Sequence, residues 1–274
     1  MANTIIVGVT DDAASRSALE WATERARAGA QPLLLVSVVG GAVGAVGEEE
    51  VVDAAVAGVR ERLEATAATV RATGLPVEVR VTHGNPVAEL IDASEDGALL
   101  VIGGAPRGHG RGRHGGRIAA GAKCPVVIVP AASTPGTGVI VGVDGSEVSD
   151  AAVTFAADEA ARAGETLTVV STWMPVAVAG DFGVYPDLYL ADLNGITASG
   201  VDRVVEAVRA AHPDLDVHTH VTEGDPATVI VEQSAGARLV VVGSHGRGAF
   251  ARFLLGSVSE EVVAHLVTAT AVVR

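Results

Sequence analysis

Glycine, arginine and serine residues are concentrated in one segment near the end of the chain, residues 240–263, VVVGSHGRGAFARFLLGSVSEEVV. The segment leaves a run of valines at Gly243, passes through a glycine-rich loop and enters an amphipathic stretch at Gly256 and Ser257. The cationic or imidazole side chains of the loop are His245, Arg247 and Arg252. Glycines let the backbone approach an anion closely, and the amides and dipole of a helix N-terminus attract negative charge. The segment therefore predicts a phosphate-binding site.

The same segment also predicts where its helix begins. Glu260 follows Ser257 by three residues, the spacing of a capping box in which the serine is the N-cap. The alternative is an ordinary strand–loop–helix connection with a good cap. Such connections usually have about 2 to 6 residues, and this loop is longer. Its glycines also lie where a parallel sheet places a ligand, so phosphate binding is favoured.

The chain repeats itself. The matching pairs are residues 4–22 with 138–156, residues 81–91 with 221–231, and residues 98–104 with 238–244. Three matches in the same order indicate a tandem duplication. Residues 131–138, AASTPGTG, have the composition of a linker. We therefore predict two domains, residues 1–132 and 137–274.

Short runs of Val, Leu and Ile alternate with longer amphipathic stretches in each copy. In the first copy the runs are residues 4–9, 32–39, 77–82, 99–103 and 126–129. Between the second and third runs, apolar side chains recur at the spacing of one helical face. These are Val52, Ala55, Val59, Leu63, Ala67 and Val70. The pattern predicts an α/β fold, with a five-stranded parallel sheet covered on both faces in each copy and ligands at the carboxyl ends of the strands.

The composition excludes several classes of function. Apolar residues make up 49% of the 274 residues, so a buried core is expected, and 19 Lys and Arg against 33 Asp and Glu give a net charge of −14. That charge argues against a general binder of nucleic acid or of anionic membranes. Cys124 is the single cysteine, which excludes an internal disulfide and a thiolate cluster. With no signal peptide or apolar run of about 18 residues recognised, we predict a cytoplasmic protein.

The glycine spacing resembles the G-x2-G-x9-G-[ST] pattern of ATP-binding universal stress proteins. The matching residues are Gly243, Gly246, Gly256 and Ser257. Residues 141–149, VGVDGSEVS, are similar to the first-strand signature of that family, and residues 223–226, EGDP, follow in order. The resemblance covers both copies and nearly the whole chain, as in tandem universal stress proteins of actinobacterial type.

This resemblance implies two Rossmann-like domains of the adenine nucleotide alpha hydrolase-like type, each with strand order 3-2-1-4-5. It implies that Asp144 faces the adenosine part of ATP, that the loop of residues 243–259 holds ribose and phosphates, and that Thr172 offers backbone to adenine. The implied nucleotide-binding residues are Gly142, Asp144, Thr172, Gly243, Ser244, His245, Gly246, Arg247, Gly248, Gly256, Ser257, Val258 and Ser259. The alternative for Asp144 is ordinary Asp-Gly turn chemistry, with Ser146 capping the next helix.

The first copy departs from this pattern. Thr10 stands at the position of Asp144, Pro106 replaces the middle glycine, and Arg113 replaces the serine after the last glycine of a shorter loop. Proline removes an amide donor and fixes its own φ. We therefore predict that the first copy is degenerate for ATP.

Two other groups of residues allow alternative readings. Residues 107–117, RGHGRGRHGGR, are either a solvated loop or a loop that binds an anion or a partner. The formal dinucleotide fingerprint that they contain begins too far after the strand. His218 and His220 share one strand face, which suits a metal pair, but an exposed edge without a third ligand is favoured.

Three classes of function compete at this point: an ATP-binding regulatory or sensor protein in the stress response, a slow ATP hydrolase or phosphotransferase, and an interaction scaffold without nucleotide. The chain has no GxxxxGK[ST], GxSxG or HExxH motif and no evident base for water, so we predict a binding protein and not an enzyme. We expect ATP, or a related adenine nucleotide, with Mg²⁺ as a further option, together with an unidentified protein partner. The resemblance also implies that residues 126–130 and 271–274 pair to form an internal pseudo-dimer; association of two chains is left open.

Overall fold

The computed structural model describes the chain except residues 1–2, 41–47, 105–111, 132–135, 176–186 and 247–253. It divides into two compact units, which consist largely of residues 1–133 and of residues 134–274.

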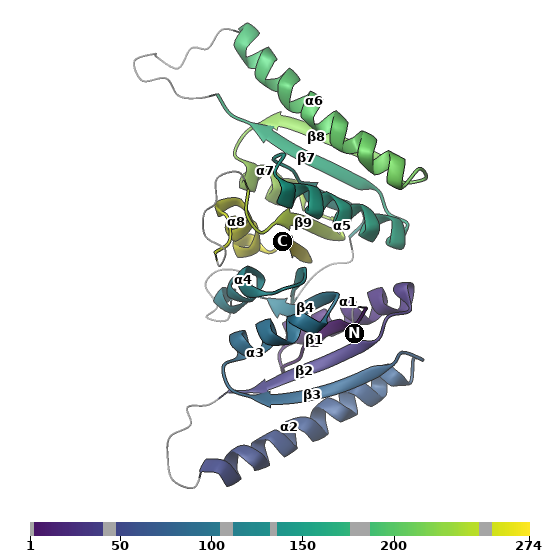
Figure 1. Cartoon of the computed structure of the whole chain (residues 1–274), viewed down its shortest axis with the longest axis vertical. Coiled ribbons are helices and arrows are strands. Elements are labelled where there is room, and N and C mark those ends of the chain that lie inside the picture. Colours follow the sequence, from purple (N-terminus) through teal and green to yellow (C-terminus); the bar gives the residue numbers. More distant parts are fainter. Residues whose placement is uncertain (1–2, 41–47, 105–111, 132–135, 176–186, 247–253) are drawn as a thin grey trace. The chain divides into compact units, whose positions relative to one another are not determined.

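The first unit is a parallel sheet covered by helices on both faces (Figure 1). Its elements are β1 Ile5–Gly8, α1 Ala13–Gly29, β2 Leu33–Val39, α2 Glu48–Arg71, β3 Val77–His83, α3 Pro86–Ala93, the 3₁₀ helix η1 Ser94–Asp96, β4 Leu99–Gly104, α4 Gly112–Gly121 and β5 Val126–Pro130. Neighbouring strands pair in the order β3-β2-β1-β4-β5. Helices α1 and α2 pack on one face of the sheet, and α3 and α4 pack on the other.

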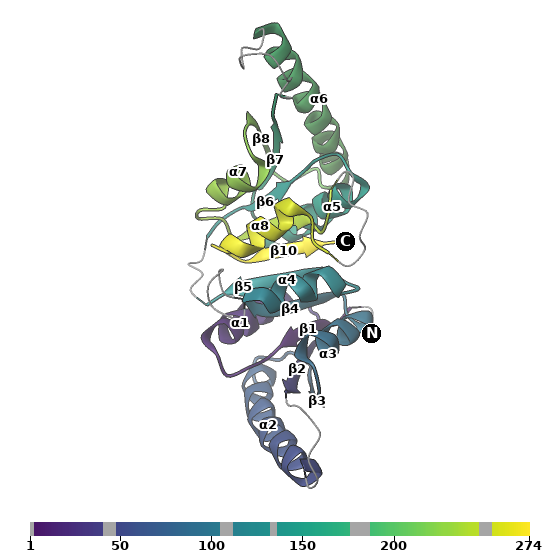
Figure 2. The same cartoon turned by 90° about the vertical axis from the view of Figure 1, so that its left-hand side faces the viewer.

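The second unit repeats this architecture (Figure 2). Its elements are β6 Val139–Gly142, α5 Glu147–Ala163, β7 Leu167–Trp173, α6 Asp187–Ala211, β8 Val217–Glu223, α7 Pro226–Gln233, β9 Leu239–Gly243, α8 Ser257–His265 and β10 Thr270–Val273. The strands pair in parallel in the order β8-β7-β6-β9-β10. Counted along its own unit, each sheet has the order 3-2-1-4-5, and α5 and α6 cover the face opposite α7 and α8.

The apolar runs of the sequence are the strands of the sheet. In the first unit each observed strand begins and ends within one residue of its predicted run. Ile5, Ile6 and Val7 of β1 have no exposed surface, although alternate side chains of a strand point to opposite faces. Helices on both faces of the sheet explain why the run is continuously apolar.

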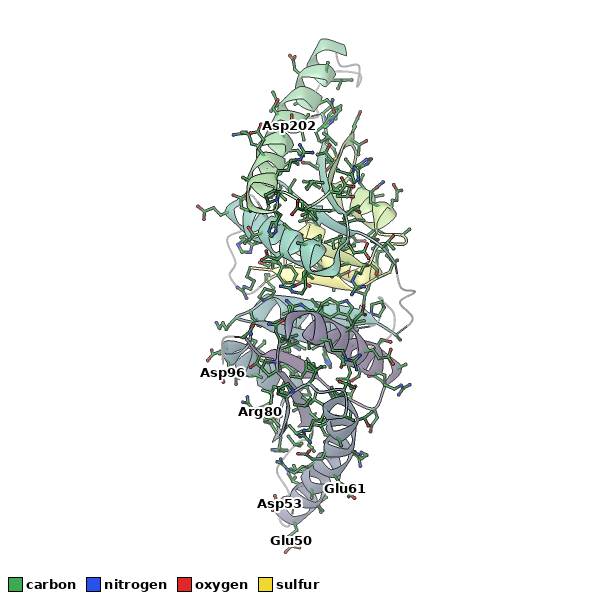
Figure 3. All side chains as sticks on the ribbon, turned by 90° about the vertical axis from the view of Figure 1, so that its right-hand side faces the viewer. Glu50, Asp53, Glu61, Arg80, Asp96 and Asp202 are labelled. Carbon is green, nitrogen blue, oxygen red and sulfur yellow. The ribbon has the colours of Figure 1, made fainter. Side chains whose placement is uncertain are left out.

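Helix α2 buries a shorter apolar face than predicted. Leu63, Ala67 and Val70 are buried, whereas Ala55, in the N-terminal half, is exposed. Figures 1 and 2 show this half continuing past the strands, so no sheet lies beneath it. The corresponding helix α6 has the same form, with Ile196 70% exposed. In Figure 3 the acidic side chains of Glu50, Asp53 and Glu61 project from α2, and all three are exposed.

Cys124 is buried two residues before β5 begins, and burial raises the pKa of its thiol to about 11. The thiol is therefore protonated at neutral pH, and it packs as a small apolar group. No helix in the described part of the chain is both long enough and apolar enough to cross a membrane.

Helix α7 generates a prediction about stability. Asp225 is its N-cap, and its carboxylate accepts bonds from the backbone N and the hydroxyl of Thr228, both at 2.9 Å. These bonds lower the pKa of Asp225 in the folded chain. Because the pKa of Asp225 is lower in the folded chain, its ionised carboxylate stabilises the fold at pH values above its pKa in the unfolded chain, about 3.9. This stabilisation is lost as the pH falls through the pKa of the folded chain. We expect Asp225→Ala to lower the free energy of unfolding by about 1 kcal/mol at pH 7. Because the cap is exposed, the loss should lie towards the low end of the range for a lost N-cap.

Urea unfolding of both proteins at pH 7 and at pH 3 measures this cost. The difference between wild type and Asp225→Ala should shrink at the lower pH. Asp225→Asn keeps an acceptor oxygen and serves as the control that retains most of the stability. Equal stability of Asp225→Ala and wild type at pH 7 would contradict the role of this cap.

Candidate functional site

A cleft of about 1220 Å³ opens in the second unit where β6 and β9 end. The two strands pair directly, Val141 beside Val241. The chain leaves them for α5 on one face of the sheet and α8 on the other, so this is the topological switch point. Ten of the predicted site residues line the cleft: Gly142, Asp144, Thr172, Gly243, His245, Gly246, Gly256, Ser257, Val258 and Ser259. The other three differ: Ser244 is buried behind it, and Arg247 and Gly248 lie outside the described residues.

The turn after β6 brings Asp144 into this cleft. Its Oδ1 accepts bonds from the backbone N of Ser146 at 3.0 Å and from the Ser146 hydroxyl at 2.7 Å. Ser146 in turn caps α5, accepting from the backbone N of Ser149 at 3.2 Å. The turn chemistry suggested for this dipeptide is therefore present. The turn also holds the exposed carboxylate of Asp144 at the edge of the cleft. A role in the turn is therefore compatible with a role in ligand binding.

The glycine loop touches the turn after β6. A Cβ atom at Gly246 would overlap the carboxylate of Asp144. A Cβ at Gly256 would lie 3.1 Å from Cα of His245, and a Cβ at Gly243 would lie 3.0 Å from Cγ1 of Val148. Both distances are shorter than ordinary van der Waals contacts between carbon atoms. These three glycines are thus required by close approach of backbone and side chains.

The two ends of the loop are tied together by hydrogen bonds. The backbone N of Gly256 donates to the carbonyl oxygen of Ser244 at 2.8 Å. The Ser259 hydroxyl lies 3.0 Å from the same oxygen and 2.9 Å from the carbonyl oxygen of Gly256, so its one hydrogen serves both. Ser244 and Ser259 are each 2% exposed. The backbone of Ser244 and the side chain of Ser259 therefore anchor the loop in the protein interior.

The predicted capping box at the start of α8 is wrong. Gly256 and not Ser257 is the N-cap, with φ −66° and ψ 157°, and no side chain makes a cap hydrogen bond. The helix starts one residue earlier than predicted because Gly256 is anchored to Ser244 and its carbonyl accepts from the backbone N of Glu260 at 2.9 Å. Ser257 is consequently the first helical residue. Among the described residues, no side chain accepts a hydrogen bond from the first amides of the helix, at residues 257–259.

The other described helix starts in the two units are capped differently. Side chains of Asp12, Asn85, Ser146 and Asp225 accept from the first-turn amides of α1, α3, α5 and α7. Among the α-helices whose N-cap lies in the described residues, α8 has the one N-terminus without such a side chain. Its dipole and amides face the cleft, which is the arrangement that binds an anion.

Thr172 lies near the end of β7, half-buried, in register with Thr222 of β8. Beyond the predicted residues, side chains of α5, α6 and α7 also line the cleft, among them Ser149, Val153 and Ile230. Ile230 occupies the space beside Gly142, where a Cβ would lie 2.6 Å from its Cδ1. The apolar periodicity of these helices was visible in the sequence, but it does not indicate which turns reach the cleft.

The corresponding edge of the first unit differs in chemistry. The Thr10 hydroxyl donates to Oδ2 of Asp12 at 3.0 Å. Asp12 is also the N-cap of α1, where its side chain accepts from the backbone N of Ser15. Pro106 and residues 107–111 of the basic segment lie outside the described residues; His114 and Arg117 of that segment are exposed on α4. His218, for which the sequence favours an exposed edge over a metal pair, is exposed and contacts Asp216, with Nε2 and Oδ2 3.1 Å apart. No cluster of three His, Cys, Asp or Glu side chains suited to a metal occurs in the described part of the chain.

Comparison with known proteins agrees with this geometry. The model of the universal stress protein family matches residues 1–130 and again residues 138–274. A universal stress protein of Mycolicibacterium smegmatis is 32% identical, over 98% of this chain and 96% of its own length. One from Mycobacterium tuberculosis H37Rv is 30% identical, over 94% of this chain and 92% of its own length. The crystal structure of a universal stress protein from Archaeoglobus fulgidus covers 99% of this chain and 98% of its own, with a TM-score of 0.74 and 22% identity.

The Ser259 hydroxyl generates a second prediction. Ser259→Ala removes the donor that serves two carbonyl oxygens in a buried place, so we expect a loss of about 1 kcal/mol in the free energy of unfolding. Ser199→Ala is the matched control: its hydroxyl donates to the carbonyl of Gly195 on the exposed surface of α6. That variant should stay within about 0.5 kcal/mol of wild type. Denaturant unfolding compares the two, and equal effects would show that Ser259 does not support the loop.

Proposed function

We propose that this chain, which belongs to the universal stress protein family, binds ATP in the cleft of its second unit and acts as a nucleotide-dependent regulator in the stress response. The observation that carries the proposal is the N-terminus of α8, which faces the cleft without a side-chain cap. An unsatisfied helix N-terminus beside glycines that admit no Cβ is suited to phosphate oxygens.

The residues of the cleft fit both ends of ATP. At the phosphate end, the amides at residues 257–259 and the imidazole of His245 are donors. At the other end, the exposed carboxylate of Asp144 can accept bonds from ribose hydroxyl groups, and the end of β7 at Thr172 supplies backbone for adenine. The described residues contain no group of three His, Cys, Asp or Glu side chains that could hold a metal ion. In the proposed complex, Mg²⁺ would therefore be held by phosphate oxygens and water.

The proposed activity is binding and not turnover. Amides at a helix N-terminus bind the charge of ATP and of its products alike, so they do not by themselves favour a transition state. The proposed place of Asp144 is the adenosine end, away from the phosphate that water would attack. Slow hydrolysis and a scaffold without nucleotide are the alternatives, and nucleotide titration with product analysis separates all three. The proposal also includes a cytoplasmic location and a protein partner that distinguishes the ATP-bound from the ATP-free chain. In addition, the two repeats are proposed to pair as a pseudo-dimer.

The proposal predicts one ATP per chain. The first unit has Thr10 where the second has a carboxylate, and Pro106 where the second has a glycine amide. Isothermal titration calorimetry should therefore give a stoichiometry near one. Gly104→Val, at the end of β4 in the first unit, should leave affinity and stoichiometry unchanged, whereas Gly256→Glu or Gly243→Val should abolish binding. Two sites per chain would overturn the assignment of the first unit.

Gly246→Ala is the sharpest test of the cleft. The new methyl group must displace the carboxylate of Asp144, which is the end of an exposed side chain, so the cost to the fold falls on exposed hydrogen bonds such as those that Oδ1 accepts from Ser146. We expect ATP affinity to fall about tenfold or more while the melting temperature changes little. Gly195→Ala is the matched control, because a Cβ there meets nothing within 4 Å and the residue lies outside the cleft. Unchanged affinity in Gly246→Ala would remove the support that the cleft gives to ATP binding.

A further inference from the structure

Ser244 and His245 form a hydrogen-bonded pair at the back of the cleft. The hydroxyl oxygen of Ser244 lies 2.9 Å from Nδ1 of His245. Ser244 is 2% exposed and does not line the cleft, whereas His245 is half-buried and does. The serine therefore holds the imidazole from the side that faces away from the proposed ligand.

Burial determines the direction of this bond. The Ser244 hydroxyl has no second partner in the described part of the chain. If Nδ1 carried the hydrogen and donated it, the hydroxyl hydrogen would be left in a buried place without an acceptor, which is costly. If the hydroxyl donates to Nδ1, both groups are satisfied. Donation from Ser244 is therefore favoured, and it leaves the hydrogen of the neutral ring on Nε2.

The second ring nitrogen is accessible. Nε2 of His245 has no hydrogen-bond partner among the described residues, and it is not one of the buried polar atoms without a partner. Because Nδ1 is engaged on the buried side, Nε2 is the ring nitrogen left for a molecule in the cleft. A neutral imidazole in this state donates a hydrogen bond without needing a positive charge.

We propose that Ser244 is a positioning residue that holds His245 as the Nε2–H tautomer and orients it to donate to a phosphate oxygen of the bound nucleotide. The inference rests on the proposed function for its ligand, but the tautomer belongs to the nucleotide-free protein. The pair is absent from the first unit, where Gly104 and Ala105 occupy the corresponding positions. The predicted loss of ATP binding there thus coincides with the loss of both members.

Ser244→Ala removes this interaction selectively. The backbone of Ser244 carries its other contacts: its N donates to the carbonyl oxygen of Val273 at 2.6 Å, and its carbonyl accepts from Gly256 and Ser259. None of these bonds uses the side chain. The loop should therefore stay closed in the variant, and Ser244→Thr, which keeps a hydroxyl, is the conservative control.

The tautomer is measured by ¹H–¹⁵N correlation of the histidine rings in the nucleotide-free protein at pH 8. In wild type, we expect Nδ1 of His245 to give the signal of an unprotonated, hydrogen-bonded nitrogen and Nε2 that of a protonated one. Ser244→Ala should shift the Nδ1 signal while that of His212 stays in place, and Ser244→Thr should restore it. A hydrogen on Nδ1 in the wild-type protein would overturn the assignment.

ATP titration then tests the link to the ligand. At pH 8, Ser244→Ala should bind ATP about two- to tenfold more weakly than wild type. His245→Gln places an amide near the position of Nε2, so it should bind ATP more tightly than His245→Asn. Equal affinity of wild type and Ser244→Ala for ATP would overturn the positioning role. Failure of wild type to bind ATP would instead overturn the proposed function, while the ring signals still decide the tautomer.

Discussion

The pairing of β6 with β9 is the constraint on which the site depends. Because the two parallel strands end at the same edge and lead to helices on opposite faces, the turn after one meets the loop after the other. The contact is so close that a side chain at Gly246 would displace the carboxylate of Asp144. The carboxylate of Asp144 and the amides at the start of α8 thereby line one cleft, although they are about a hundred positions apart in the chain.

Stability and binding are divided between different parts of the loop. Four of the five α-helices whose N-cap lies in the described residues use the side chain of that N-cap to satisfy a first-turn amide, and α8 does not. Its entry is held instead by backbone bonds between Gly256 and Ser244 and by the buried hydroxyl of Ser259. The loop can therefore be well anchored while its amides remain available to a ligand, which is the condition for a preformed anion site.

Duplication has conserved the packing and not the chemistry. Both units contain the same strand order and the same distribution of helices, because a five-stranded parallel sheet needs cover on both faces. The turn after the first strand differs: Asp12 caps α1 in the first unit, whereas Ser146 caps α5 in the second and leaves a carboxylate two residues earlier. The second unit thus has a serine as the N-cap and an additional carboxylate before it. This difference changes the chemistry at the edge of the sheet without disturbing its core.

The sequence by itself determined the strands, the repeat and the ten predicted residues that line the cleft at the ends of β6, β7 and β9 and at the start of α8. Buried parallel strands are continuous apolar runs, and the spacing of the glycines can be read directly from the chain. It misplaced the N-cap of α8, since Ser257 and Glu260 have the spacing of a capping box wherever the helix starts. The tertiary structure decided that start through the bond from Gly256 to Ser244. It also decided that Ser244 and Ser259 are buried and that Ala55 is exposed. These facts depend on contacts between distant segments and on where the sheet ends, which local spacing does not encode.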